Sequence, residues 1–214
     1  PLLVPGYTGS DANSYDDTVT TPGPNGVKGS ISNNSWGNGT NSNVYDAYTA
    51  QFDGYVRDAS SAGTIDPLSL IFSAGNSGPA PNSLTRPKAA KNLIATGNSE
   101  NLRTELGGVS ADSLEDLVST SSRGPAADGR VKPDIVAPGG YITGGGAGTG
   151  ASTFGFVPGT SNNILFSNGT SHAAPQVAGA AALFTQAWKE SNGGANPSPA
   201  LIKAAILNTG QEMT

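Results

Sequence analysis

A short apolar run at residues 68–72, Leu-Ser-Leu-Ile-Phe, ends abruptly in the turn-forming segment Ser73-Ala74-Gly75-Asn76. A short run that is apolar throughout is typical of a strand covered on both faces in a parallel sheet. We therefore expect a buried parallel strand here, with a polar loop at its carboxyl end.

Strand and helix patterns alternate along the chain, which favours an α/β sheet with helices on its faces. We expect Asn43 to cap the first helix, and Ser198 with Pro199 to begin the last. Residues 1–26 and 139–161 are rich in turn-forming residues, and we expect both to be loops, the first a surface loop or insertion. The expected elements in chain order are a strand at 27–34, a helix at 44–59, strands at 68–72, 92–96, 117–122 and 135–137, and two helices, one beginning at Ser171 and one running from Ser198 to Gly210.

The composition narrows the possible partners. The net charge is -5, from 11 basic and 16 acidic residues, and no Lys/Arg cluster offers a nucleic-acid footprint. No apolar run approaches the roughly 18 residues that span a bilayer. The chain has no cysteine, so disulfides and thiolate metal sites are excluded, and its Lys-poor, Ser/Asn/Gly-rich composition favours a secreted protein. We expect one domain, with no nucleic-acid or membrane partner.

The segment Gly169-Thr170-Ser171-His172-Ala173-Ala174-Pro175 carries the strongest chemical signal. A turn of small residues brings Ser171 to the start of a helix, where unpaired N–H groups and the helix dipole favour negative charge. That position suits a nucleophile that generates an oxyanion, and the Ser171 N–H could donate to it. Judged on this segment alone, an ordinary serine helix cap is the simpler interpretation.

A family resemblance favours the nucleophile over the helix cap as the interpretation of Ser171. Residues 169–179 resemble the nucleophile motif of the subtilisin-like serine proteases, G-T-S-M-A-x-P-x-V-A-G, with His172 where Met is usual. Four further segments resemble family segments in the expected order, and together they are most similar to bacterial alkaline subtilases. These are residues 33–37 (Asn-Asn-Ser-Trp-Gly), 72–79 (Phe-Ser-Ala-Gly-Asn-Ser-Gly-Pro), 121–125 (Ser-Ser-Arg-Gly-Pro) and 132–139 (Lys-Pro-Asp-Ile-Val-Ala-Pro-Gly).

The resemblance implies a fold and an activity. The fold would be a subtilisin-like three-layer α/β domain with a mostly parallel sheet, and the activity a serine endopeptidase that forms an acyl-enzyme on Ser171. Asn76 would be an oxyanion-hole donor. A polypeptide substrate would pair as an added strand between two pocket walls, Ser35-Trp36-Gly37 and Ser73-Ala74-Gly75. For Trp36, packing in the core is an equal alternative.

The triad partners of Ser171 are not recognisable. The only histidine is His172, and adjacent residues on a helix point in different directions, so His172 is not expected to act as the base. Two interpretations stay open. In the first, residues 1–214 are the C-terminal portion of a peptidase domain whose Asp and His lie in a missing N-terminal portion, and this chain alone is inactive; a start at Pro1 favours it. In the second, the chain is a noncatalytic subtilase-like binding module or pseudoprotease.

No metal ligands are assigned. An oxygen-ligand loop with fixed spacing does not occur, so we read the Asp/Asn-rich start of the chain as solvated. The chemistry requires no cofactor, although the resemblance allows structural calcium.

Overall fold

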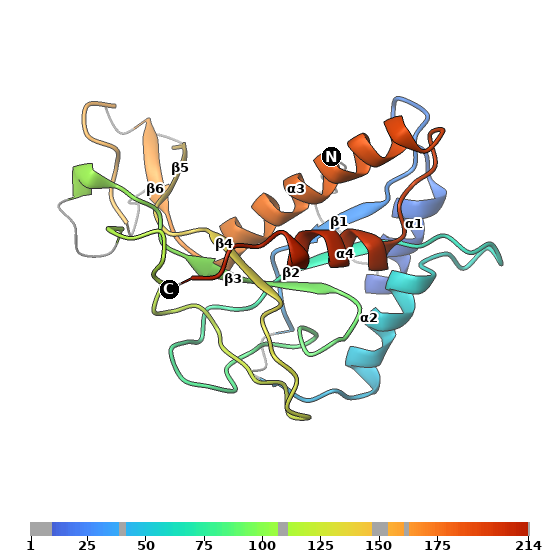
Figure 1. Ribbon diagram of the computed structural model, residues 1–214, viewed down its shortest axis with the longest axis horizontal. Coiled ribbons are helices and arrows are strands. Elements are labelled where there is room, and N and C mark those ends of the chain that lie inside the picture. Colours follow the sequence, from blue (N-terminus) through green and yellow to red (C-terminus); the bar gives the residue numbers. More distant parts are fainter. Residues whose placement is uncertain (1–9, 39–41, 107–110, 147–153, 161–162, 214) are drawn as a thin grey trace.

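The computed structural model describes residues 10–38, 42–106, 111–146, 154–160 and 163–213. Its centre is a parallel sheet of four strands in the order β1-β2-β3-β4 (Figure 1). The strands are β1 (Ile31–Asn34), β2 (Ser69–Ser73), β3 (Ile94–Ser99) and β4 (Ile135–Pro138). The α/β sheet expected from the alternation of elements is confirmed. In the described part of the chain β1 pairs with β2 alone, so β1 is an edge strand.

Helices cover both faces of this sheet. The side chains of β2 alternate between two cores, because successive residues of a strand point to opposite faces. Leu70 and Phe72 pack with α1 (Asp11–Thr20) and α2 (Ala47–Arg57), whereas Ile71 packs with α3 (Thr170–Ser191) and α4 (Pro199–Asn208). Every residue of β2 is buried, as the short apolar run predicted. The result is three layers, helix, sheet and helix.

Helix α1 corrects the prediction of a loop over residues 1–26. Its first turn is capped by Ser10, whose Oγ accepts a hydrogen bond from the Asn13 N–H at 3.3 Å. Tyr15 and Val19, four residues apart, are its buried side chains and join the core around Phe52. Two apolar residues among polar neighbours give too weak a periodicity to predict a helix. Residues 1–9 lie outside the described part of the chain.

Helix α2 is confirmed but is shorter than predicted. It begins after Asp46, whose Oδ1 accepts from the Thr49 N–H at 2.9 Å. Asn43 is therefore not the cap. Its side-chain amide donates instead to Asn82 Oδ1 and to the Pro125 carbonyl, at 3.1 and 3.0 Å.

A second sheet, of two strands, includes residues predicted to form a loop. Strands β5 (Ile142–Gly145) and β6 (Ile164–Ser167) pair antiparallel, so the loop prediction for 139–161 is wrong at β5. Figure 1 shows this pair standing apart from α1 and α2, at the other end of the molecule. The strand predicted at 117–122 is reduced to one bridge, between Leu117 and Ser99. Residues 147–153 and 161–162 are not described.

A buried ion cluster fixes α4 to the sheet. Asp134, just before β4, lies between two ammonium groups, with Lys132 Nζ at 2.6 Å and Lys203 Nζ at 2.9 Å from its oxygens. It also accepts from the Ala95 N–H of β3 at 2.8 Å. Burial lowers the pKa of Lys132 to about 8, and the Asp134 carboxylate opposes that shift. None of the helices in the described ranges is long and apolar enough to span a membrane.

Candidate active site

The residues singled out by the sequence meet at one edge of the parallel sheet. Because all four strands are parallel, their carboxyl ends lie at the same edge. Residues 35–37 follow β1 there, and residues 74–76 follow β2. Helix α3 begins at this edge too, where the Gly169 N–H donates to the Gly139 carbonyl just after β4, at 3.1 Å. Crevices at the carboxyl ends of parallel strands are the usual place for ligand sites in α/β sheets.

Ser171 is the second residue of α3, and its side chain is half-buried. Its hydroxyl donates to the Ser35 carbonyl at 3.4 Å, and the Ser35 hydroxyl donates to the Ser171 carbonyl at 2.9 Å. These contacts join the start of α3 to the loop after β1. The Ser171 N–H lies in the first turn, where backbone N–H groups have no intrahelical acceptor. Ser171 therefore combines a surface-accessible hydroxyl with a backbone donor.

Asn76 lies beside this helix start with its side-chain amide held in one orientation. Its Oδ1 accepts from the Thr170 N–H at 3.0 Å and from the Thr170 hydroxyl at 2.9 Å. The Thr170 hydroxyl in turn accepts from the Gly75 N–H at 3.2 Å. With Oδ1 engaged on Thr170, the Asn76 NH₂ is the group left to donate. The structure thus brings together the two residues that the sequence proposed for the oxyanion site.

Gly169 makes this close approach possible. Its backbone has a φ of 151°, a conformation that L side chains rarely adopt. A β-carbon there would lie 3.3 Å from Asn76 Nδ2 and crowd the amide. The glycine before the serine is therefore required by the geometry of the Asn76 side chain.

The two predicted pocket walls face a common floor. A β-carbon on Gly37 would lie 2.8 Å from Thr85 Oγ1, and one on Gly75 would lie 3.0 Å from the same atom. Gly75 also has a φ of 114°, so a side chain there would be strained as well as crowded. In the second wall Ser73 and Ala74 are buried, which leaves Gly75 as its partly open residue. The Thr85 hydroxyl thus lies between the two glycines.

Trp36 supports the core-packing alternative. Its ring centroid lies 5.2 Å from that of Phe72 and 6.1 Å from that of Phe52, in the core beneath β1 and β2. The indole N–H donates to Asn34 Oδ1 at 3.2 Å. The residue remains 37% exposed, so part of it reaches the surface while the ring is anchored in the core.

His172 is held away from Ser171. Its Nε2 lies 2.7 Å from the Ser167 hydroxyl of β6. Among the described residues the hydroxyl of Ser171 contacts the Ser35 carbonyl and no imidazole. This geometry agrees with the expectation that His172 does not act as the base, and it adds a hydrogen bond to β6 that the sequence did not predict.

Lys88 is a residue of this site that the sequence reasoning missed. Its side chain is 1% exposed, and its ammonium donates to Thr85 Oγ1 at 2.5 Å. A β-carbon on Gly37 would overlap the ammonium nitrogen. Burial lowers the pKa of Lys88 to about 8. A lysine in a short connection carries no pattern that distinguishes a buried ammonium from an exposed one.

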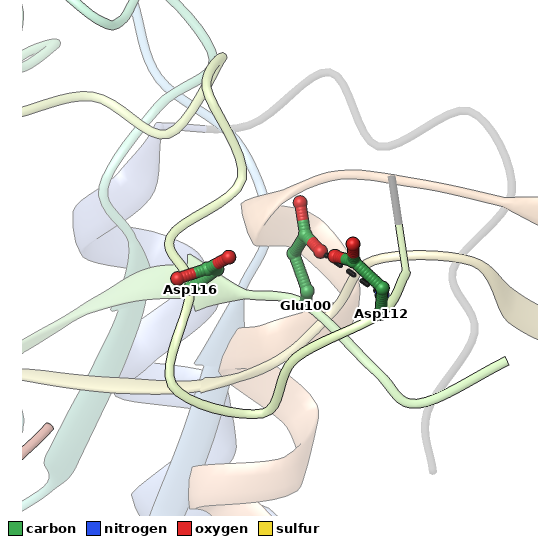
Figure 2. A group of neighbouring side chains, drawn as sticks. All are labelled: Glu100, Asp112 and Asp116. Carbon is green, nitrogen blue, oxygen red and sulfur yellow. Dashed lines mark hydrogen bonds between the residues drawn. The ribbon is translucent and has the colours of Figure 1, made fainter. Parts of the chain in front are cut away.

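A carboxylate cluster lies just beyond the carboxyl end of β3. Glu100, Asp112 and Asp116 each place an oxygen within 4.8 Å of the others (Figure 2). Burial, followed by the two neighbouring carboxylates, raises the pKa of Glu100, although the Asp112 N–H opposes this by donating to Glu100 Oε2 at 3.4 Å. Oxygen ligands of this kind are the type that hard cations such as calcium prefer. From the sequence, only the Asp/Asn-rich start of the chain was considered as a source of metal ligands, so these three carboxylates were not predicted.

Comparison with known proteins gives the family. The model of the subtilase family, peptidase S8, matches residues 5–213, which includes helix α1. The chain is 39% identical over 110 residues to the serine protease/ABC transporter B family protein tagD of Dictyostelium discoideum, covering 44% of this chain and 6% of that protein. It is 38% identical over 85 residues to serine protease AprX of Bacillus subtilis (strain 168), covering 39% and 17%.

The fold of a solved relative agrees. The prenylagaramide maturation protease PagA superposes with a TM-score of 0.60 at 23% identity, covering 94% of this chain and 56% of that one. The chain thus spans about half of this structural relative and a much smaller share of the curated relatives. The subtilisin-like α/β fold expected from the motifs is confirmed, and the family is one of serine peptidases. The chain belongs to the subtilase family.

Proposed function

We propose that this chain supplies the nucleophile, the oxyanion hole and the substrate groove of a serine endopeptidase. The observation that carries the proposal is the arrangement at the start of α3, where Ser171 follows Thr170 and Thr170 orients the amide of Asn76. Two donors aimed at one place beside a serine hydroxyl are the arrangement that stabilises acyl-transfer intermediates.

In the proposed reaction Ser171 Oγ attacks the carbonyl carbon of a peptide bond and passes its proton to a base. The carbonyl oxygen becomes an oxyanion, which accepts hydrogen bonds from the Ser171 N–H and the Asn76 NH₂. The C–N bond then breaks, the amine leaves with a proton, and an ester on Ser171 remains. Water hydrolyses this ester and restores the serine hydroxyl.

The substrate is proposed to lie as an extended strand between Ser35-Trp36-Gly37 and Ser73-Ala74-Gly75. The loop after β1 is exposed, so its backbone groups are available to a peptide. Gly37 and Gly75 bring the backbone of each wall close to the groove, because neither carries a side chain.

The general base is proposed to come from outside residues 1–214. His172 is the only histidine of the sequence, and its ring contacts Ser167. We propose that a further portion of the catalytic domain in the same gene product supplies the Asp and His. Without a base, turnover falls by about a millionfold, the loss known for subtilisin itself. We therefore expect residues 1–214 alone to be inactive.

A fluorophosphonate, which reacts with activated serines, tests this proposal. The complete gene product should be labelled rapidly on Ser171, whereas residues 1–214 alone should be labelled at a background rate. Rapid labelling of residues 1–214 alone would contradict the proposed inactivity. A complete gene product that binds peptides but is neither labelled nor hydrolytic would instead support the noncatalytic alternative, which the absence of a base near Ser171 among the described residues favours.

A further inference from the structure

Lys88 places a buried ammonium group at the floor of the proposed groove. The groove is bounded by the glycines of its two walls, Gly37 and Gly75, and both face the Thr85 hydroxyl. Lys88 Nζ lies 2.5 Å from that hydroxyl and occupies the space where a β-carbon of Gly37 would be. Because Gly37 lacks that carbon, the ammonium lies directly beneath the backbone of the first wall.

The charge of this ammonium is not neutralised within the described structure. Its hydrogen bonds go to Thr85 Oγ1 and, at 3.5 Å, to the Arg86 carbonyl, which are both uncharged acceptors. The Phe72 ring, 5.9 Å away, adds a weak cation–π contact. The neighbouring Arg86 is itself paired with Asp46. Among the described residues no carboxylate forms an ion pair with Lys88.

Lys132 is a second buried lysine, and its ammonium pairs with a carboxylate. It is similarly buried, at 6% exposure, and burial lowers its pKa to about 8, as it does that of Lys88. Lys132, however, lies 2.6 Å from the Asp134 carboxylate. A buried charge without a partner is costly, so buried ammonium groups are usually paired. Of these two buried lysines, Lys88 is the one without a carboxylate partner among the described residues, and it lies at the proposed groove.

The remaining hydrogen-bond donors of the Lys88 ammonium and the Thr85 hydroxyl are suited to a carboxylate ligand. An ammonium has three protons, of which Thr85 and Arg86 engage two. The Thr85 hydroxyl accepts from Lys88 and keeps its own proton for another acceptor. One N–H and one O–H therefore have no acceptor among the described residues, and a carboxylate has two oxygens to accept them.

We propose that Lys88, with Thr85, selects substrates with Glu or Asp immediately before the scissile bond. This inference rests on the proposed function, because that function places the substrate residue between Gly37 and Gly75. Binding of the acidic side chain would supply the carboxylate that Lys88 lacks. Neutral residues of the same shape, Gln and Asn, would leave the ammonium without a counter-charge and would bind less well.

Isosteric substrates test the selectivity without any change to the protein. The complete gene product is assayed with two peptide pairs that differ only in Glu against Gln, and in Asp against Asn, at the residue before the cleaved bond. We expect kcat/KM to be about tenfold or more higher for each acidic member, as for a hydrogen bond to a charged group. Equal values within both pairs would overturn the role of Lys88 while leaving the peptidase function standing.

Variants assign the selectivity to Lys88. Lys88→Met should reduce the Glu/Gln ratio to near one, whereas Lys91→Met should leave it unchanged. Lys91 is the matched control because it lies in the same connection with its side chain 53% exposed. A Lys88→Met enzyme that keeps the full preference would contradict the proposal.

A binding measurement separates this inference from the activity. Peptides that end in Glu or in Gln are titrated into the complete Ser171→Ala protein, and the Lys88 ammonium is followed by nitrogen-15 NMR. The Glu peptide should bind about tenfold more tightly, and it should raise the pKa of Lys88 from about 8. Equal binding of the two peptides would overturn the proposal even if no peptide is ever hydrolysed.

Discussion

The side-chain oxygen of Asn76 accepts two hydrogen bonds from a single residue, Thr170, through its backbone N–H at 3.0 Å and its hydroxyl at 2.9 Å. Thr170 is also the first residue of α3 and immediately precedes Ser171. The proposed nucleophile and the proposed oxyanion donor are therefore positioned by the same residue. A shift of the helix start would move both together.

Thr170→Val should lower kcat about tenfold with little change in KM. The substitution keeps the size and the backbone N–H of Thr170, but it removes the hydroxyl that holds Asn76 and that accepts from Gly75. Asn76→Ala should cost about 10²–10³ in kcat, the loss known for the oxyanion-hole asparagine of subtilisin. Steady-state peptide hydrolysis by the complete protein measures both. Thr209→Val, at the exposed end of α4, is the control, and a Thr170→Val enzyme as fast as this control would refute the positioning role.

Asp134→Asn should destabilise the fold by about 3–5 kcal/mol, because it leaves two ammonium groups without a charged partner in a buried place. Urea unfolding at neutral pH measures the loss. Asp128→Asn serves as the matched control, since its carboxylate pairs with Arg130 at the surface, and we expect it to leave the unfolding free energy nearly unchanged. Equal effects of the two substitutions would show that the buried cluster contributes no more than a surface pair.

Phe52→Ala should cost about 3–5 kcal/mol of unfolding free energy. Phe52 is fully buried, and its ring packs against five other aromatic rings: Tyr15, Trp36, Tyr48, Tyr55 and Phe72. Its loss would open a cavity between α1, α2 and β2. Leu183→Ala, at a position 70% exposed on α3, should change the midpoint of urea unfolding little. A Phe52→Ala protein as stable as the Leu183→Ala protein would contradict the packing described for this core.

The sequence predicted the buried strand and α3 well because their patterns are local. Residues 68–72 are apolar enough to identify a strand covered on both faces, and α3 carries an apolar face over 22 residues. Helix α1 was missed because Tyr15 and Val19 alone define its buried face. Strand β5 was missed because Thr143, Gly144 and Gly145 are exposed and offer no apolar alternation.

The candidate site was only partly predictable from the sequence. Ser171, Asn76 and both walls could be placed, because each follows a strand or begins a helix within a family motif. Lys88 could not be identified, because its importance comes from its proximity to Gly37 and Thr85. Gly37 lies more than fifty residues before Lys88 in the sequence. Contacts between distant segments depend on how the chain folds back, which no local pattern encodes.

Glu100→Gln should stabilise the protein at neutral pH. Burial and the neighbouring Asp112 and Asp116 raise the pKa of Glu100, so the folded state holds its proton more tightly than the unfolded state does. The stability that this proton gives is fully present below the ordinary carboxyl pKa of about 4.3 and is lost as the pH rises through the raised value. Glutamine mimics the protonated form, so the gain should be largest at pH 7 and should vanish toward pH 4.

Urea midpoints between pH 4 and 7, measured with a chelator to remove divalent cations, test this prediction. Glu190→Gln, at an exposed position of α3, is the control and should show no such pH-dependent gain. If Glu100→Gln proves no more stable than the wild type at pH 7, burial and repulsion in this cluster do not destabilise the charged form of Glu100 measurably.

Trapping the acyl-enzyme tests the central claim most directly. The complete gene product is mixed with a slowly hydrolysed ester of an N-acylated Glu, quenched in acid and digested, and the peptide that contains residues 169–179 is examined by mass spectrometry. The account predicts that the acyl group lies on Ser171 and that Ser171→Ala abolishes both the adduct and peptide hydrolysis. An adduct on another residue, or hydrolysis that survives in Ser171→Ala, would show that Ser171 is not the nucleophile.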